Sequence, residues 1–387
     1  MAKSLIVHII CHFDDTNASG GLEQQARLLT RTLRAAGEQV VVLASTRKWS
    51  RAVWTSDCGV PVRLFWTYHS PQLSGRYFPA ALIWAVQLLC WIALNRRRIA
   101  LIHVHQLRIH AFVAAVARRL LKIPAVMKSA LGGPGADIYA IASRKYFGSP
   151  GQGFVVRSGT HFVATTPSIE YELVESGVPR DRICLIPNGM KMSSAQKCAP
   201  SAARRVQRCL YLGRIAPDKN VLALVTAAAR VASLDTLTVD IYGKGHLLKD
   251  LQELLANISN PAVSYRGFVA DTGSVLADYG WLLLPSDGEG LSNAMVEAMS
   301  HGVVPLTTRV SGCVDHIQDG VTGYFFDGVD DASLRRGLVG LTTVAAEQWK
   351  KMSERVSQHA RRHFDMEAVA GCYRQLYDTL HHERTLS

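Results

Sequence analysis

The sequence predicts an α/β protein with two domains, each built on a parallel β-sheet. The chain of 387 residues is long enough for two separate hydrophobic cores. Short apolar runs alternate with helical segments in both halves, which is typical of parallel strands joined by helices. A polar segment without periodicity, residues 191–205, separates the halves and is rich in Ser, Ala, Lys and Pro.

The composition favours a soluble globular protein. Hydrophobic residues make up 48% of the chain and charged residues 19%, and no block is typical of disorder. The eight cysteines are scattered without a C-x-x-C pair, which argues against a structural zinc site and fits reduced thiols in the cytoplasm. The opening run MAKSLIVHII is too short for a signal peptide and is predicted to be the first strand.

The net charge of +12 is unevenly distributed. Residues 1–200 contain 24 Lys or Arg and 10 Asp or Glu, a balance of +14, whereas residues 201–387 contain 19 and 21, a balance of −2. A basic first half predicts contact with a polyanion or an anionic membrane, and the alternative is an arginine-rich coding bias without a partner. Nucleic-acid binding is not expected, because no basic patch is interleaved with aromatic residues.

No stretch reaches the roughly 18–20 apolar residues of a membrane-spanning helix. The nearest is residues 78–94, which is interrupted by Gln87 and followed by the arginines at 96–98. Its tryptophans and this arginine triplet would suit a helix lying at the membrane interface. An ordinary packed helix with a basic C-terminal end is the alternative, and the sequence leaves both open.

In the first half, the apolar runs predict strands at 4–11, 39–44, 100–105, 124–128, 162–166 and 183–186. Helices are predicted at 22–36, where Leu22, Ala26, Leu29 and Leu33 form one stripe before Gly37, and at 168–175, before Gly177. In the second half, strands are predicted at 209–212, 238–242, 263–266, 282–285 and 303–306. The helices there are predicted at 221–232, 292–301, 332–341, 345–363 and 366–381.

The stretch 281–308 contains the strongest candidate site. Ligands of parallel sheets bind at the carboxyl ends of strands, and a Gly-rich turn follows the strand ending at Pro285. The backbone N–H groups of Gly290, Leu291 and Ser292 and the positive end of the helix from Asn293 onward favour an anion there.

Two carboxylates, Glu289 and Glu297, flank this point. Beside an anion they would be repulsive unless they accepted hydrogen bonds from sugar hydroxyls. Solvated glutamates at the helix end are the alternative.

Cations occur in another strand-to-helix loop. Arg214 and Lys219 lie between a strand and a helix and are predicted to bind a diphosphate, Arg through its planar fork and Lys as a point charge. Pairing of both with Asp218, or simple solvation, is the alternative. In the next loop the glycines around Gly243 would admit a base or ribose.

Two histidines end the strand at 100–105. His103 and His105 are two residues apart and therefore point to the same face. Zinc binding would need a third ligand, and none is apparent nearby in the sequence, so no metal site is predicted. Asp14 and Asp15 are adjacent rather than in a D-x-D arrangement and are interpreted as loop carboxylates.

Glu289-x7-Glu297, set in PSDGEGLSNAMVEAMSHGVVPLTT, resembles the donor-site signature of glycosyltransferase family 4. The run from Gly213-Arg214 to Lys219-Asn220 and the IPNG turn at 186–189 resemble further motifs of that family, in the same order. The resemblance implies a GT-B fold: two Rossmann-like domains that face each other across a cleft, at 1–195 and 205–365. The helix at 366–387 would then cross back onto the first domain.

The resemblance also implies an activity. It is the retaining transfer of a sugar from a nucleotide diphosphate sugar to a saccharide or lipid-linked saccharide, for cell-surface polysaccharide or glycolipid synthesis. Arg214, Lys219 and the backbone near Leu291 would stabilise the leaving diphosphate, Glu289 would hold the donor sugar and Glu297 the ribose. No metal is demanded, because the fixed cations replace it, and no cofactor is implied, since the nucleotide diphosphate sugar is a co-substrate. A GT-B phosphorylase or epimerase, or a non-catalytic sugar-nucleotide-binding protein, is the alternative.

The resemblance places further residues at the site. Gly20 and Gly21 would let the backbone approach the diphosphate, and Phe268-Val269 would lie beside the base. His105 would lie near the acceptor. Many members have a histidine where Lys128 and Ser129 stand here, and Lys128 would suit a phosphate or carboxylate on the acceptor. The expected location is cytoplasmic, with peripheral attachment at the inner face of the membrane as a hypothesis.

Overall fold

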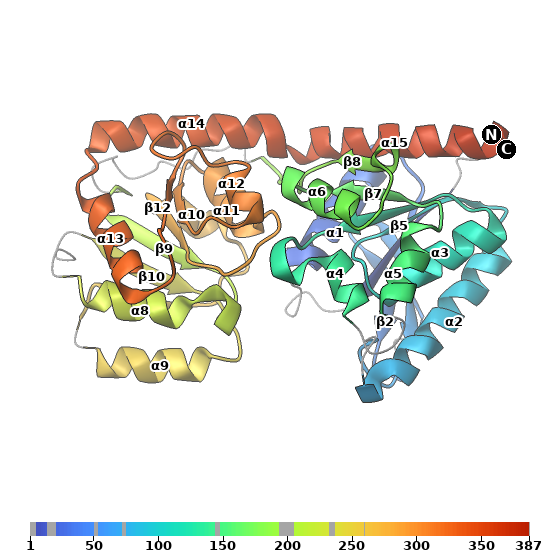
Figure 1. Cartoon of the computed structure of the whole chain (residues 1–387), viewed down its shortest axis with the longest axis horizontal. Coiled ribbons are helices and arrows are strands. Elements are labelled where there is room, and N and C mark those ends of the chain that lie inside the picture. The colour runs from blue at the N-terminus through green and yellow to red at the C-terminus, as the bar shows by residue number, and fades with distance from the viewer. Residues whose placement is uncertain are drawn as a thin grey trace. The chain divides into compact units, whose positions relative to one another are not determined.

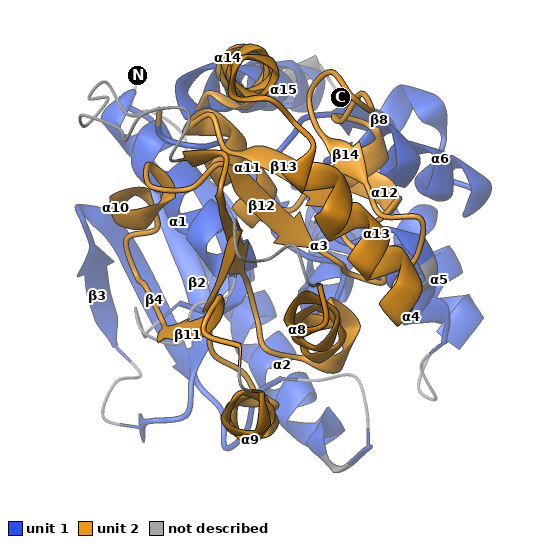
Figure 2. Cartoon of the chain, turned by 90° about the vertical axis from the view of Figure 1, so that its left-hand side faces the viewer, with its two compact units in different colours: residues 1–191, 366–387 blue, residues 192–365 orange. Residues whose placement is uncertain are grey.

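The computed structural model describes residues 5–13, 21–49, 53–71, 75–143, 148–192, 205–231, 237–258 and 260–386. The chain divides into two compact units: unit 1 is residues 1–191 with 366–387, and unit 2 is residues 192–365 (Figures 1 and 2). Each unit has its own sheet covered by helices. The predicted α/β class is confirmed.

Unit 1 is built on an eight-stranded sheet with the order β3-β4-β2-β1-β5-β6-β7-β8. Every neighbouring pair is parallel except the β3–β4 hairpin, which the sequence did not predict because β3 is polar and mostly exposed. The strands are β1 (Leu5–His12), β2 (Val40–Thr46), β3 (Trp54–Asp57), β4 (Val60–Trp66), β5 (Ile99–Val104), β6 (Ala125–Ser129), β7 (His161–Ala164) and β8 (Ile183–Leu185).

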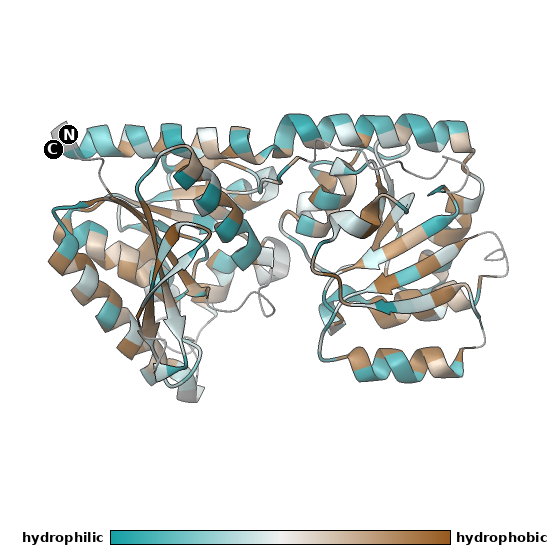
Figure 3. Ribbon diagram, turned by 180° about the vertical axis from the view of Figure 1, so that it is seen from behind, coloured by the Kyte–Doolittle hydropathy of each residue, from teal (hydrophilic) through white to brown (hydrophobic). Residues whose placement is uncertain are grey.

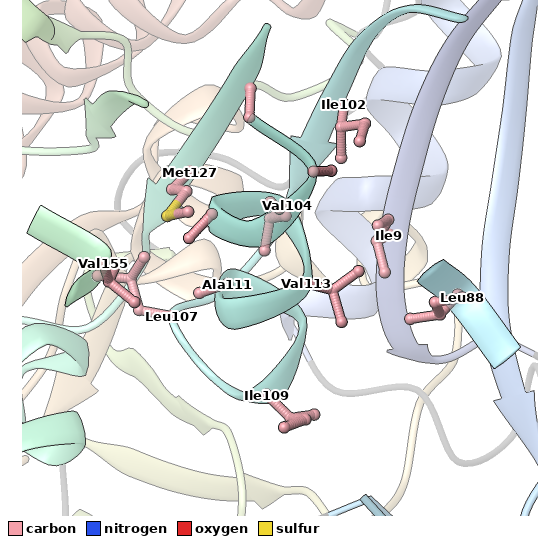
Figure 4. Close-up of a cluster of buried hydrophobic side chains, with 14 of the residues drawn as sticks. Ile9, Leu88, Ile102, Val104, Leu107, Ile109, Ala111, Val113, Met127 and Val155 are labelled. Carbon is pink, nitrogen blue, oxygen red and sulfur yellow. The ribbon is translucent and has the colours of Figure 1, made fainter. Parts of the chain in front are cut away.

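Helices cover both faces of this sheet, and alternate residues of β1 show why. Ile6 and Ile10 face a layer formed with α1 (Gly21–Ala35) and α15 (Met366–Leu386). Val7 and Ile9 face the opposite layer, where Figure 4 shows side chains of β1, β5, α2 and α3 meeting. The helices of that second layer are α2 (Phe78–Asn95), α3 (Ile109–Leu121), α4 (Asp137–Ala142), α5 (Gly148–Val156) and α6 (Pro167–Glu175).

The last helix of the chain belongs to unit 1. Tyr373 of α15 is buried against the sheet, and the backbone N–H of Met366 donates to the carbonyl of Met190 at 2.9 Å. Gln25 of α1 bonds both the N–H and the carbonyl of Gly189. These bonds tie the turn after β8 to the start of α15 and to α1.

Unit 2 has a fully parallel six-stranded sheet with the order β11-β10-β9-β12-β13-β14. Strand β12 lies near the centre of this sheet, and all four of its residues are buried. Helix α14 is largely hydrophilic on its outer side (Figure 3). The strands are β9 (Arg208–Leu212), β10 (Thr238–Tyr242), β11 (Val263–Gly267), β12 (Trp281–Leu284), β13 (Val304–Thr307) and β14 (Tyr324–Phe325). The helices are α8 (Val221–Ala229), α9 (Leu248–Asn257), α10 (Gly273–Leu276), α11 (Asn293–Ser300), α12 (Ser311–Val314), α13 (Asp331–Thr342) and α14 (Ala346–Phe364).

Candidate functional site

The two loops singled out from the sequence lie together in unit 2. Strands β9 and β12 are parallel neighbours, so the loops that follow them leave the same edge of the sheet. The β12–α11 loop ends at Ser292, whose hydroxyl accepts a hydrogen bond from the N–H of Met295 and so caps α11. A Cβ on Gly312 would lie 2.2 Å from the carbonyl oxygen of Gly290, so the glycine permits close packing behind this loop.

Asn220 joins the two loops. Its φ of +50° is left-handed, and its side-chain amide donates to the carbonyl of Pro285 at 2.9 Å and to the carboxylate of Asp287 at 2.6 Å. The N–H of Asp287 donates to the carbonyl of Asp218 at 3.0 Å. These three bonds hold the β9–α8 loop against the β12–α11 loop before any ligand is present.

Lys219 and Glu289 form an ion pair across these loops. Nζ of Lys219 lies 2.8 Å from Oε1 of Glu289 and 3.3 Å from the carbonyl oxygen of Gly288. The side chains are 12% and 15% exposed. Ser286 donates its hydroxyl to the same Oε1 at 2.9 Å, while Oε2 of Glu289 has no hydrogen-bond partner in the part of the chain that the structure describes.

Arg214 is the more open of the two predicted cations. Its side chain is 64% exposed, and its guanidinium lies 3.0 Å from the carboxylate of Asp218, which also lies 3.3 Å from Nζ of Lys219. The alternative in which Asp218 pairs with both cations therefore occurs in this structure. The result is a compact cluster of two cations and two carboxylates, which sequence spacing alone did not establish.

Glu297 lies on α11 and is mostly buried. Its Oε2 accepts a hydrogen bond from the hydroxyl of Thr272 at 2.7 Å. Burial raises the pKa of Glu297, and the Thr272 hydrogen bond partly opposes this. Thr272 was not predicted as a site residue, because nothing in the short segment before α10 indicates that this side chain faces α11.

The β10 and β11 loops contain the other predicted donor-site residues of unit 2. Gly243 has a φ of +154°, and a Cβ there would lie 1.9 Å from the carbonyl oxygen of Gly213. Its own backbone neighbour therefore requires a glycine at this position, and room for a base or ribose at this loop stays a prediction. Phe268 is half exposed with Nζ of Lys244 4.2 Å from its ring centroid, and Val269 is partly buried.

The predicted residues of unit 1 are more enclosed. Gly20 lies outside the described residues, as do Asp14 and Asp15, and Gly21 is the first residue of α1. Lys128 on β6 is 5% exposed, and its Nζ donates to Oδ1 of Asn188 at 2.8 Å. Burial lowers the pKa of Lys128 to about 8. As placed, Lys128 supports the IPNG turn and does not reach solvent.

His105 belongs to a buried histidine cluster, together with His8 and His103. His8 on β1 is the register partner of His103 on β5, so the tertiary structure supplies the third imidazole that the local sequence lacks. Nδ1 of His8 lies 2.9 Å from Nε2 of His105, and Nδ1 of His103 lies 2.6 Å from the hydroxyl of Tyr377 on α15.

These imidazoles are neutral because of their burial, which lowers the pKa of His8 to about 3 and the pKa values of His103 and His105 as well. Three ring nitrogens lie within 4.8 Å of one another. Three imidazoles are a ligand set that zinc uses, but here the rings of His8 and His105 bond each other and the Lys128 charge acts on His103 and His105. These contacts fit a hydrogen-bonded core better than a divalent cation, and the contact of His105 with an acceptor stays a prediction.

The chain is similar to known glycosyltransferases. Residues 20–189 match the model of the glycosyl transferase 4-like domain, and residues 206–343 match that of the glycosyl transferases group 1. Among curated relatives, an N-acetyl-alpha-D-glucosaminyl L-malate synthase of Bacillus anthracis is 22% identical over 73% of this chain and 75% of its own. The capsular polysaccharide biosynthesis glycosyltransferase CapM of Staphylococcus aureus is 23% identical, over 44% of this chain and only 49% of its own length.

Solved structures agree on the fold. HepE of Anabaena, in complex with UDP and glucose, has a TM-score of 0.74 at 15% identity, over 97% of this chain and 100% of that one. Sucrose-phosphate synthase from Thermosynechococcus elongatus has a TM-score of 0.78 at 17% identity, over 98% and 99% of the two chains. At these identities the likeness shows the fold, which is that of GT-B glycosyltransferases.

Proposed function

Because this chain belongs to glycosyltransferase family 4, we propose that it transfers a hexosyl group from a nucleotide diphosphate sugar with retention of the anomeric configuration. The acceptor is a saccharide or a lipid-linked saccharide of a cell-surface polysaccharide or glycolipid. The observation that carries the proposal is the contact of Lys219 with Glu289 where the β9 and β12 loops meet.

The cluster supplies the charges that this reaction needs. Cleavage of the anomeric bond leaves negative charge on the diphosphate and positive charge on the sugar ring. Arg214 is exposed and Lys219 is held in place, so the two can stabilise the leaving diphosphate without reorganisation of the protein. These fixed cations supply positive charge that a metal ion provides in other enzymes, and we propose that the reaction is metal-independent.

Donor binding would change the partners of the ion pair. A diphosphate beside Lys219 gives the ammonium a second anion, which weakens its hold on Glu289. Glu289 can then accept hydrogen bonds from sugar hydroxyls, since Oε2 bonds no residue in the described part of the chain. Burial raises the pKa of Glu297, whereas hydrogen bonds donated by ribose hydroxyls would favour its charged form.

Thermal-shift measurements with UDP, GDP and their sugars test donor binding, because a bound ligand stabilises the fold in proportion to the logarithm of its saturation. NMR of the product formed with the stabilising donor then reports its anomeric configuration. If none of these nucleotides or nucleotide sugars changes the unfolding temperature, the proposal is refuted. Product formation that needs inorganic phosphate and no acceptor would instead indicate a phosphorylase.

We also propose that the protein works in the cytoplasm, at the inner face of a membrane. The charge of +14 on residues 1–200 supports attraction to anionic lipids, and a lipid-linked acceptor would be reached there.

A further inference from the structure

Helix α2 (Phe78–Asn95) has no charged residue, and its outer face is apolar. Trp84, Leu88 and Ile92 are buried against unit 1. On the other side five side chains are exposed at helical spacing, and we call them the α2 stripe: Leu82, Ile83, Val86, Cys90 and Leu94. Leu82 and Val86 are about half exposed, and Leu94 is 87% exposed. A surface helix of a soluble domain normally carries polar residues on that side, as α14 does (Figure 3).

The apolar surface continues onto Trp54 of β3. Trp54 is 53% exposed, and its ring centroid lies 6.3 Å from that of Trp91 on α2. Val53, just before β3, is also half exposed. Exposed tryptophan beside aliphatic side chains is typical of surfaces that enter the interfacial region of a bilayer.

Exposed positive charge lies at the ends of α2 and α3. Between Asp57 and Asp137 the chain has ten Lys or Arg, of which Lys128 is buried, and no acidic residue. The arginines at 96–98 are exposed where α2 ends, and α3 ends in Arg119, Leu120 and Lys122, which are exposed as well. Because β5 and β6 start directly after these helices, both basic clusters lie at the edge where the parallel strands begin.

We propose that the α2 stripe lies in the interfacial region of an anionic lipid bilayer, with the arginines at 96–98 against headgroup phosphates. The apolar side chains enter the headgroup–acyl boundary, and the arginines add an electrostatic attraction that salt screens. The inference rests on the proposed function, because binding to the bilayer would bring unit 1 to a lipid-linked acceptor.

The mode of binding is peripheral. In the part of the chain that the structure describes, α2 is the one helix long and apolar enough to cross a membrane by length and composition. However, its inner face holds Trp84 and Leu88 in the core of unit 1, so crossing would require that core to open. Lying on the surface leaves the core intact.

The test is co-sedimentation of the full chain with phosphatidylcholine vesicles, with and without phosphatidylglycerol, at low and high salt. A stripe variant, Leu82→Glu with Val86→Glu, and an arginine variant, with all three arginines at 96–98 changed to Ser, are compared with wild type. The matched control is Val174→Glu with Leu185→Glu, which adds the same charge at exposed apolar positions of α6 and β8.

Wild type and the control should bind the anionic vesicles, more weakly at high salt, and each of the other two variants should bind about tenfold less or worse. Equal binding by wild type and the stripe variant would overturn the proposal, as would no binding by wild type. Light scattering tests the other possible occupant, a second copy of the chain. If wild type is a dimer that does not bind vesicles, and the stripe variant is a monomer, this surface is an interface between copies of the chain. A thermal shift with UDP on the same samples tests the donor site separately.

Discussion

Lys219 and Glu289 are seventy positions apart in the chain, yet the ammonium lies 2.8 Å from the carboxylate. Each belongs to a loop that follows a central strand of the unit 2 sheet. The pair places a cation and an acid side by side where donor binding is proposed, and it also gives each side chain a structural partner. The first two predictions separate these roles.

Lys219→Ala, and separately Arg214→Ala, should each lower kcat/KM by a factor equivalent to about 2–4 kcal/mol, the effect of removing one preorganised electrostatic group. Steady-state kinetics with saturating acceptor measures it. Lys249→Ala is the control, because Lys249 is an exposed lysine of α9. Turnover close to wild type in both variants would remove these residues from the catalytic assignment.

A double-mutant cycle with Lys219→Met and Glu289→Gln should give a coupling free energy of about 1–3 kcal/mol in urea unfolding, because both side chains are largely shielded from water. The comparison cycle uses Lys249 and Glu253, an exposed i,i+4 pair with an expected coupling of about 0.3–0.5 kcal/mol. Equal couplings in the two cycles would show that the Lys219–Glu289 pair contributes no more than a surface pair.

Gly243→Ala should destabilise unit 2 by about 3 kcal/mol or more, since the new Cβ would meet the carbonyl oxygen of Gly213 and neither backbone can move easily. Gly340→Ala is the control, because Gly340 lies inside α13 and no atom lies within 4 Å of the new Cβ. This substitution should stabilise the protein by about 0.5–1 kcal/mol. Calorimetry of both variants measures the changes. A Gly243→Ala protein with a wild-type Tm would contradict the close approach.

Stability should fall at acid pH because of the buried histidines. The pKa of His8 is about 3 in the folded protein against an ordinary value of 6.5, so below about pH 6.5 the unfolded chain binds a proton that the folded chain does not. The free energy of unfolding then decreases by up to about 1.4 kcal/mol per pH unit for this one histidine.

Urea unfolding at about pH 7.5 and about pH 5.5 measures this loss. His8→Gln should lose about 1 kcal/mol less than wild type between the two conditions. His246→Gln, at an exposed position, should lose as much as wild type. An identical loss in the His8→Gln variant would show that His8 is protonated in the folded state.

Most strands of both sheets could be predicted from the sequence because apolar runs are a local property, whereas helices such as α3, α5 and α9 were not predicted. Strands β1, β5 and β12 are buried on both faces, so their sequences are nearly continuous apolar runs. Such runs can be recognised as strands without knowing which strands pair with them. Strand β3 was missed for the opposite reason, since it is mostly exposed and its pattern is not apolar, and its partner β4 was missed although its residues are buried or half-buried.

The α/β class, the family and the residue types of the donor loops could be inferred from the amino-acid order alone, since short motifs and hydrophobic periodicity are local properties of the chain. Which side chains meet became known from the fold: Lys219 with Glu289, Thr272 with Glu297, and His8 with His103 and His105. It also decided which side of α2 stays exposed. The physical reason is that these contacts depend on strand order, and strand neighbours in a parallel sheet are far apart in sequence.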